Sequence, residues 1–219
     1  FKVILVFNFF YNQLDTKLLD DSNIKLKQET NYPWDGNIKI TVEECKSDAF
    51  DVLLRIPDWA TKYSLAVNGK TQKTTAKTGT FATLNRQWKK GDVITLNLPM
   101  DIKLLEGNPL IEEVRNQAAI KRGPIVYCVE SPDLPKDSNI LDVYLPVNSK
   151  LTADYKSDVL GGVTTISGNV KLRKNDQIGM YREMNGIKWT NYKAQFIPYF
   201  TWSNRGESEM SVWLPVIFD

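Results

Sequence analysis

Short stretches of alternating apolar and polar residues, separated by turn residues, restrict the fold of this 219-residue chain more than any other feature. Isoleucine and valine alternate with polar residues over 38–42, and residues 52–56 show a similar pattern that ends at Pro57. Because neighbouring side chains on a β-strand point to opposite faces, this period of two predicts half-buried strands. Asn68-Gly69 is typical of a hairpin turn. Together these features predict an all-β fold of the sandwich type.

The strand pattern is interrupted near Asp101, which divides the chain into two units of about 100 residues, a common domain size. Residues 112–120 have the propensity of a short helix, but we interpret them as mostly strand because Gly123-Pro124 and a β-rich segment follow. The strands expected from the pattern cover residues 38–42, 51–56, 65–67, 80–85, 93–98, 102–105, 125–129, 141–146, 151–155, 162–166, 193–199 and 210–214.

The composition excludes several classes of function. The chain has no histidine, which rules out Ser-His-Asp, Cys-His and histidine–metal chemistry within it. Its 28 basic and 26 acidic residues leave a net charge of +2, so we expect no nucleic-acid partner. No apolar run approaches the roughly 20 residues of a membrane-spanning helix, and we expect no membrane partner. Cys45 and Cys128 are expected to be free, buried thiols, with a single disulfide as the alternative.

Carboxylates are the remaining candidates for chemistry. Glu43-Glu44 and Glu112-Glu113 are adjacent pairs, and neighbours on a strand point apart, so neither pair converges on one substrate. Glu43 and Cys45 are two positions apart, which could place them on one face of a strand. A zinc site needs more ligands than these two, so we expect no metal site.

Tryptophan offers a different kind of site. Flat aromatic rings stack on sugar faces, and most of the six tryptophans are expected in the core, with Trp88 closing the end of a sandwich. Trp34 is the best candidate for an exposed ring because it lies in a turn between two strands. Trp34, Asp35 and Asn37 are therefore our candidate carbohydrate-binding residues.

An ordered set of short motifs extends over residues 24–215 and resembles the C-terminal part of glycoside hydrolase family 127, whose members are similar to β-L-arabinofuranosidases. The motifs cover residues 28–36, 54–60, 67–69, 88–100, 122–128, 197–206 and 212–215. Residues 1–13 depart from the family pattern, and the chain opens with Phe1 instead of Met. We therefore expect it to be part of a longer protein.

The resemblance implies a specific architecture. Family members have an (α/α)6 catalytic barrel followed by two jelly-roll-like β-sandwich domains, the second inserted near the end of the first. By analogy, residues 1–100 plus 208–219 would form the first sandwich, and residues 101–207 would form the inserted second one.

The resemblance also implies a division of labour. It implies a zinc-bound cysteine nucleophile held by barrel residues, and this chain lacks the adjacent cysteines of that site. We therefore assign no catalytic residue and no cofactor to it. The function implied is a non-catalytic double sandwich that supports the missing barrel in bacterial degradation of arabinose-containing or other plant glycans. A periplasmic or secreted location is favoured over a cytoplasmic one.

Three other functions stay open at this point. They are a stand-alone carbohydrate-binding module, an adhesive sandwich without a sugar ligand, and an independent enzyme that uses a carboxylate pair.

Overall fold

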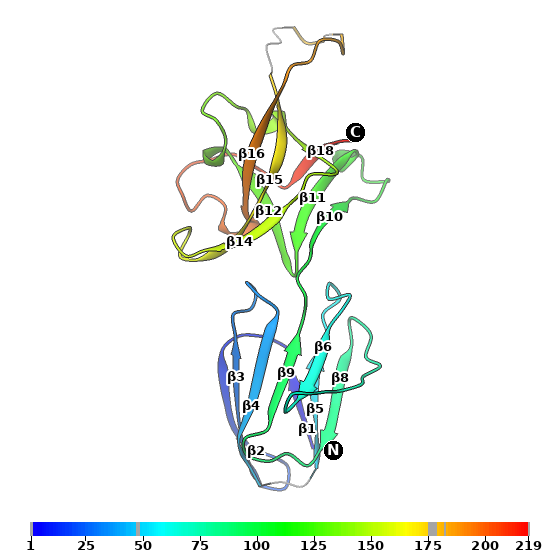
Figure 1. Ribbon diagram of the computed structural model, residues 1–219, viewed down its shortest axis with the longest axis vertical. Coiled ribbons are helices and arrows are strands. Elements are labelled where there is room, and N and C mark those ends of the chain that lie inside the picture. Colours follow the sequence, from blue (N-terminus) through cyan, green and yellow to red (C-terminus); the bar gives the residue numbers. More distant parts are fainter. Residues whose placement is uncertain (1, 47–48, 175–178, 182, 219) are drawn as a thin grey trace. The chain divides into compact units, whose positions relative to one another are not determined.

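The computed structural model describes residues 2–46, 49–174, 179–181 and 183–218 (Figure 1). Its regular elements are β-strands and single-turn 3-10 helices, which confirms the all-β fold. The chain divides into unit 1, Phe1–Met100, and unit 2, Asp101–Asp219.

Unit 1 is a sandwich of two sheets. The smaller sheet has the order β1-β5-β8, in which β1 (Val3–Val6) runs parallel to β5 (Phe50–Arg55) and β8 (Phe81–Arg86) lies at the other edge. The larger sheet has the order β2-β3-β4-β9-β6-β7. Its strands are β2 (Asn12–Lys17), β3 (Asn23–Thr30), β4 (Asn37–Cys45), β9 (Val93–Asn97), β6 (Ser64–Val67) and β7 (Lys70–Thr71).

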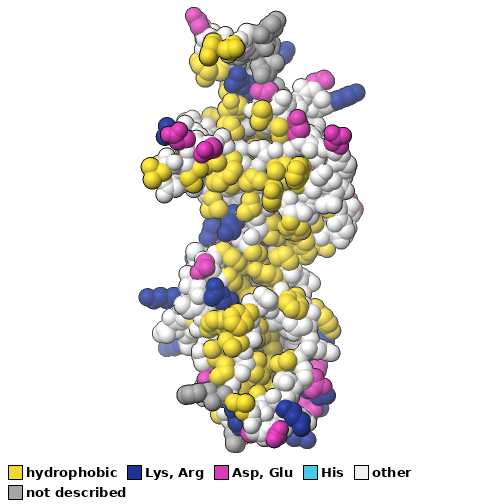
Figure 2. Space-filling view, turned by 180° about the vertical axis from the view of Figure 1, so that it is seen from behind, with side chains coloured by type: hydrophobic (Ala, Val, Ile, Leu, Met, Phe, Trp, Pro, Cys, Tyr) yellow, Lys and Arg dark blue, Asp and Glu magenta, His cyan; other side chains and the backbone are white. Residues whose placement is uncertain are grey.

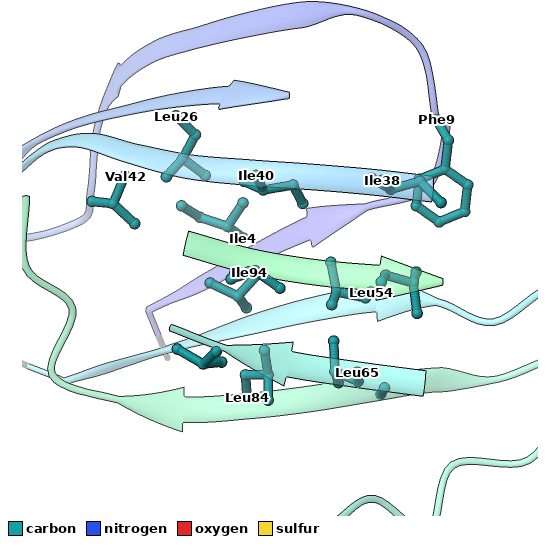
Figure 3. Packing of buried hydrophobic residues seen from close by; sticks show 14 of the residues in the cluster. Ile4, Phe9, Leu26, Ile38, Ile40, Val42, Leu54, Leu65, Leu84 and Ile94 are labelled. Atoms are coloured by element: carbon teal, nitrogen blue, oxygen red, sulfur yellow. The ribbon is translucent and has the colours of Figure 1, made fainter. Parts of the chain in front are cut away.

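Alternate residues of these strands form the core of unit 1, as the period of two predicts. Figure 3 shows Ile38, Ile40 and Val42 of β4 pointing toward side chains of the smaller sheet. Trp88 is 2% exposed, and its indole N–H donates a hydrogen bond to the Phe50 carbonyl at 3.1 Å. The burial expected for most of the tryptophans is confirmed for Trp88.

Unit 2 is built on one curved sheet. In it β11 (Gln117–Arg122), β18, β13, β15, β16 and β12 pair in succession, and β12 pairs again with β11, so the ring of strands closes. The other strands pair with members of this ring. The remaining elements are β10 (Ile102–Glu106), β12 (Ile125–Glu130), β13 (Val143–Pro146), β14 (Thr152–Lys156), β15 (Val163–Arg173), β16 (Trp189–Pro198), β17 (Met210–Ser211), β18 (Trp213–Ile217), and the 3-10 turns η1 (Glu112–Val114), η2 (Ser131–Asp133), η3 (Ile140–Asp142) and η4 (Tyr199–Thr201).

Two details correct the sequence analysis. Residues 208–219 were assigned to the first sandwich, but β17 pairs with β12, and β18 lies between β11 and β13 in unit 2. The ring needs this strand because β11 and β13 would otherwise each present an open edge, and Leu214 of β18 is buried. Residues 112–120 are a 3-10 turn followed by a strand that begins only at Gln117.

Candidate functional site

The outer face of the larger sheet in unit 1 carries an open depression of about 530 Å³. Residues of β3, β4, β9, β6 and β7 form its floor, and the turn before β4 forms one end. Figure 1 shows β3, β4, β9 and β6 side by side in this sheet. A volume of this size falls within the roughly 300–1,000 Å³ that is usual for sites of small ligands.

Strand register arranges the floor in two rows. Asn37 of β4 lies opposite Asn97 of β9, which in turn lies opposite Ser64 of β6. The second row contains Lys39, Thr95 and Ala66, and Glu29 of β3 lies opposite Lys39. The residues between these positions, such as Ile38, Leu65 and Leu96, are buried in the core. The same alternation that builds the core therefore directs polar side chains outward.

Hydrogen bonds and ion pairs hold the polar groups in place. Asn97 Nδ2 donates to Asn37 Oδ1 at 2.6 Å, and the Asn37 backbone N–H donates to Asp35 Oδ1 at 2.8 Å. Glu29 is paired with Lys27 at 3.0 Å and with Lys39 at 3.2 Å. The hydrogen bond from Lys27, followed by that from Lys39, lowers the pKa of Glu29, so this carboxylate is charged at neutral pH.

The structure brings together two of the three residues predicted for carbohydrate binding. Asp35 and Asn37 line the depression, but the half-buried Trp34 is not among its lining residues. The more exposed rings are Trp189 and Trp202, each 39% exposed, and both belong to unit 2. Asn97 was missed because only strand pairing places it beside Asn37.

A second polar cluster lies in unit 2 around Glu130, whose side chain is fully buried. Arg205 Nε donates to Glu130 Oε2 at 3.0 Å, and its Nη2 contacts the same oxygen. Oε1 accepts hydrogen bonds from the Ser203 backbone N–H at 3.0 Å and from Ser208 Oγ at 2.5 Å. Arg205 also pairs with Asp133, at 2.9 Å from Nη1 to Oδ1. This network ties residues 203–208 to the end of β12.

The network leaves little capacity for acid–base chemistry. Burial alone would raise the pKa of Glu130, but hydrogen bonds from Ser208, Arg205 and Ser203 outweigh it and lower that pKa. The hydrogen bond to Asp133 is the largest influence that raises the pKa of Arg205, so the guanidinium stays charged. Two carboxylates that share one guanidinium are suited to holding a loop.

The described residues do not fit a zinc site. Cys45 and Cys128 are free thiols in different units; Cys128 is buried, whereas Cys45 is half-buried and packs against the unit 1 core. A bulge in the pairing of β3 with β4 inserts Glu43, so Glu44 lies opposite Lys25 and Cys45 lies opposite Ile24. Across the described parts of the chain, no three His, Cys, Asp or Glu side chains form a group that could hold a metal ion.

Comparison with known proteins gives the family. The model of the β-L-arabinofuranosidase GH127 middle domain matches residues 3–100, and that of the glycoside hydrolase family 127 C-terminal domain matches residues 102–215. The chain belongs to glycoside hydrolase family 127. Within the described residues, no helix is long and apolar enough to cross a membrane.

Relatives of this family 127 chain are longer than it is. A non-reducing end β-L-arabinofuranosidase of Bifidobacterium longum subsp. longum is 30% identical over 205 residues, which cover 87% of this chain and 30% of that protein. A solved structure of a glycoside hydrolase matches 97% of this chain and 35% of its own, with a TM-score of 0.90 and 36% identity. A GH127 β-L-arabinofuranosidase from Geobacillus stearothermophilus T6 has a TM-score of 0.89 at 31% identity, over 99% of this chain and 34% of its own. The chain thus spans about a third of these relatives.

Proposed function

We propose that this chain is the non-catalytic β part of a family 127 glycoside hydrolase and supports a catalytic barrel that degrades arabinose-containing plant glycans. The observation that carries the proposal is the position of the two family models. One falls on each unit, and the chain that they match spans only about a third of its relatives, so most of each relative lies outside the region matched here. The ion pairs of Glu130 and Asp133 with Arg205 engage these two carboxylates in holding a loop, which suits a supporting role.

An exposed apolar surface on unit 1 supports docking of another domain. We define the N-terminal apolar surface as Leu5, Phe7, Phe10 and Leu14, which are 37–57% exposed and line a depression of about 270 Å³. Figure 2 shows hydrophobic side chains gathered over this unit. Apolar patches of this kind mark interaction surfaces when a protein is otherwise polar outside.

The strand order gives this surface a second property. Among the described strands, β1 and β2 lie at the ends of their sheets, so each has one edge without a partner strand. Open edges attract further backbone pairing unless another element covers them. A barrel that packs against the N-terminal apolar surface would cover both the apolar side chains and these edges.

A chimera tests the proposed function. The matching region of the Bifidobacterium longum enzyme is replaced by this chain, and hydrolysis of p-nitrophenyl β-L-arabinofuranoside is measured beside a variant from which the region is deleted. We expect the chimera to be active, the deletion variant to be inactive, and this chain alone to be inactive. Hydrolysis by this chain alone, or a chimera no more active than the deletion variant, would refute the proposal.

Paired substitutions in the chimera test the docking surface. Phe7→Ser with Phe10→Ser removes two exposed rings from the N-terminal apolar surface, and we expect the catalytic activity to decay faster on heating. Leu19→Ser is the matched control because Leu19 is 85% exposed and lies outside this surface. Equal thermal inactivation of the two variants would contradict docking at this surface.

A further inference from the structure

The depression on unit 1 presents an amide pair that is suited to a diol. We define the amide-pair site as Asn37, Asn97, Thr95, Lys39, Glu29 and Asp35, all of which line the depression. One hydrogen bond joins the two amides, from Asn97 Nδ2 to Asn37 Oδ1. Each amide carries two donors and two acceptor positions, so Asn37 keeps its NH2 group and Asn97 keeps its carbonyl oxygen for a ligand.

This arrangement does not depend on how the amides are oriented. The oxygen and nitrogen of an asparagine side chain are assigned from the hydrogen-bond network. If both amides were turned over, Asn97 would present NH2 and Asn37 would present oxygen. In either case a donor and an acceptor lie next to each other, which matches two neighbouring hydroxyl groups of a sugar.

The surrounding charges favour a neutral ligand. Glu29 and Asp35 contribute two carboxylates, and Lys39 contributes one ammonium group that is paired with Glu29 at 3.2 Å. Lys27 is also paired with Glu29, at 3.0 Å, so the charges balance, and an anionic sugar such as a uronate would find both ammonium groups already paired with a carboxylate. The small side chains of Thr95, Ala66 and Ser64 leave the floor open between these groups.

The site is also held rigidly. Five of its six residues lie on the paired strands β3, β4 and β9, and Asp35 is fixed by the Asn37 backbone N–H and by Asn31 Nδ2 at 3.4 Å. A ligand would therefore meet polar groups that are already in position, which lowers the entropic cost of binding. Because the lining holds no aromatic ring, stacking adds nothing, and we expect millimolar affinity.

We propose that the amide-pair site binds a neutral glycan through neighbouring hydroxyl groups, with furanosides of L-arabinose as the first ligands to test. The choice of sugar rests on the proposed function, whereas the diol chemistry rests on the site. The site would hold a part of the polysaccharide and raise its local concentration.

Titration by nuclear magnetic resonance tests the proposal on the full chain. Methyl β-L-arabinofuranoside is added to ¹⁵N-labelled protein, with galacturonic acid as the anionic probe. We expect saturable shifts of the Asn37 and Asn97 side-chain NH2 signals with the arabinofuranoside and none with galacturonic acid. No saturable shift with the neutral sugar, tighter binding of galacturonic acid, or shifts confined to unit 2 would each overturn the proposal.

Two variants locate the binding. Asn97→Ala should raise the Kd for the arabinofuranoside about tenfold, which corresponds to a loss of roughly 1.4 kcal/mol of binding free energy. Gln13→Ala is the matched control because Gln13 is an exposed amide on β2 outside the amide-pair site, and its Kd should stay within about twofold of the wild type. Equal Kd values for Asn97→Ala and the wild type would also overturn the site.

This result is separable from the result of the chimera. An active chimera without glycan binding by the chain would leave the supporting role intact and remove the amide-pair site. Glycan binding by the chain together with an inactive chimera would instead indicate a stand-alone carbohydrate-binding module.

Discussion

Substitution of Glu130 by Gln tests the buried network of unit 2 with one change of a single atom. The native carboxylate accepts hydrogen bonds at both oxygens, from Arg205 at Oε2 and from Ser203 and Ser208 at Oε1. Glutamine keeps only one oxygen. If that oxygen faces Arg205, the buried NH2 group of the glutamine meets the backbone N–H of Ser203, and two donors face each other where the carboxylate had supplied an acceptor.

The expected loss of stability follows from these contacts. An unsatisfied buried donor costs about 1–3 kcal/mol, and hydrogen bonds to a charged group exceed neutral ones by about 1 kcal/mol each. Since Arg205 keeps Asp133 as a partner, the guanidinium does not become an isolated buried charge. We therefore expect Glu130→Gln to lower the free energy of unfolding of unit 2 by about 2–4 kcal/mol at neutral pH.

Hydrogen exchange read by mass spectrometry is the suitable assay because it follows both units in one chain. Peptides of β12 and β16 should exchange faster in Glu130→Gln, while peptides of β4 and β9 in unit 1 should be unchanged. Unchanged exchange in β12 at neutral pH would refute the reasoning that the carboxylate stabilises the unit.

The effect should also depend on pH in a defined direction. The pKa of Glu130 is lower in the folded protein than the roughly 4.3 of an unfolded glutamate, so the unfolded chain binds more protons between these values. The stabilisation by Glu130 is present above about pH 4.3 and is lost as the pH falls through the folded pKa. The difference between wild type and Glu130→Gln should therefore shrink on acidification, and a difference that grows would contradict the assignment.

Two further predictions concern buried groups. Trp88→Phe removes the donor to the Phe50 carbonyl and part of a buried ring, so it should destabilise unit 1 by about 2–4 kcal/mol. Hydrogen exchange should accelerate in unit 1, and an equal acceleration in unit 2 would contradict this prediction. Burial raises the pKa of the Cys128 thiol to about 12, so iodoacetamide at pH 8 should alkylate the half-buried Cys45 before Cys128. Mass spectrometry reads the order of modification, and earlier alkylation of Cys128 would refute this prediction.

Local patterns predicted the strands of unit 1 well because each pattern reports the strand's own burial. The alternation at residues 38–42 and 52–56 gives the inward faces of β4 and β5, and Asn68-Gly69 forms the turn between β6 and β7. β2 and β3 were not predicted, although Ile24 and Leu26 of β3 alternate with polar residues and are buried. β2 has no buried residue, so its sequence carries no inward stripe to detect.

Pairing between distant strands could not be predicted in the same way. The position of β18 between β11 and β13 depends on which open strand edges remain in unit 2. The sequence of β18 alone does not indicate with which strands it pairs. The bulge at Glu43 could not be predicted either, because it is defined by the pairing of β4 with β3. Gly36 is a further example: an added Cβ would lie 1.8 Å from the Leu98 carbonyl oxygen, a contact that exists only in the folded sandwich.

The candidate site was predicted only in part, because some of its residues come together only through strand pairing. The turn before β4 indicated Asp35 and Asn37, which are close in sequence, but it also favoured Trp34, which the structure leaves out of the lining. Asn97 lies 60 positions from Asn37 and joins it only through the pairing of β4 with β9. A polar residue on the outward face of a strand gives no sign of its partner until the register is known.

The two polar clusters differ in what they can do, and the difference can be measured. In unit 2, Glu130 and Asp133 share Arg205, and the surrounding donors fill the oxygens of the buried Glu130. In unit 1, the bond between Asn37 and Asn97 is exposed and uses only part of their capacity. Changes at Glu130 should therefore alter stability without a direct effect on glycan binding, and changes at Asn97 should alter binding with little effect on stability. If Asn97→Ala destabilised unit 1 as much as Glu130→Gln destabilises unit 2, the amide pair would be a structural contact and its outward groups would not need a ligand.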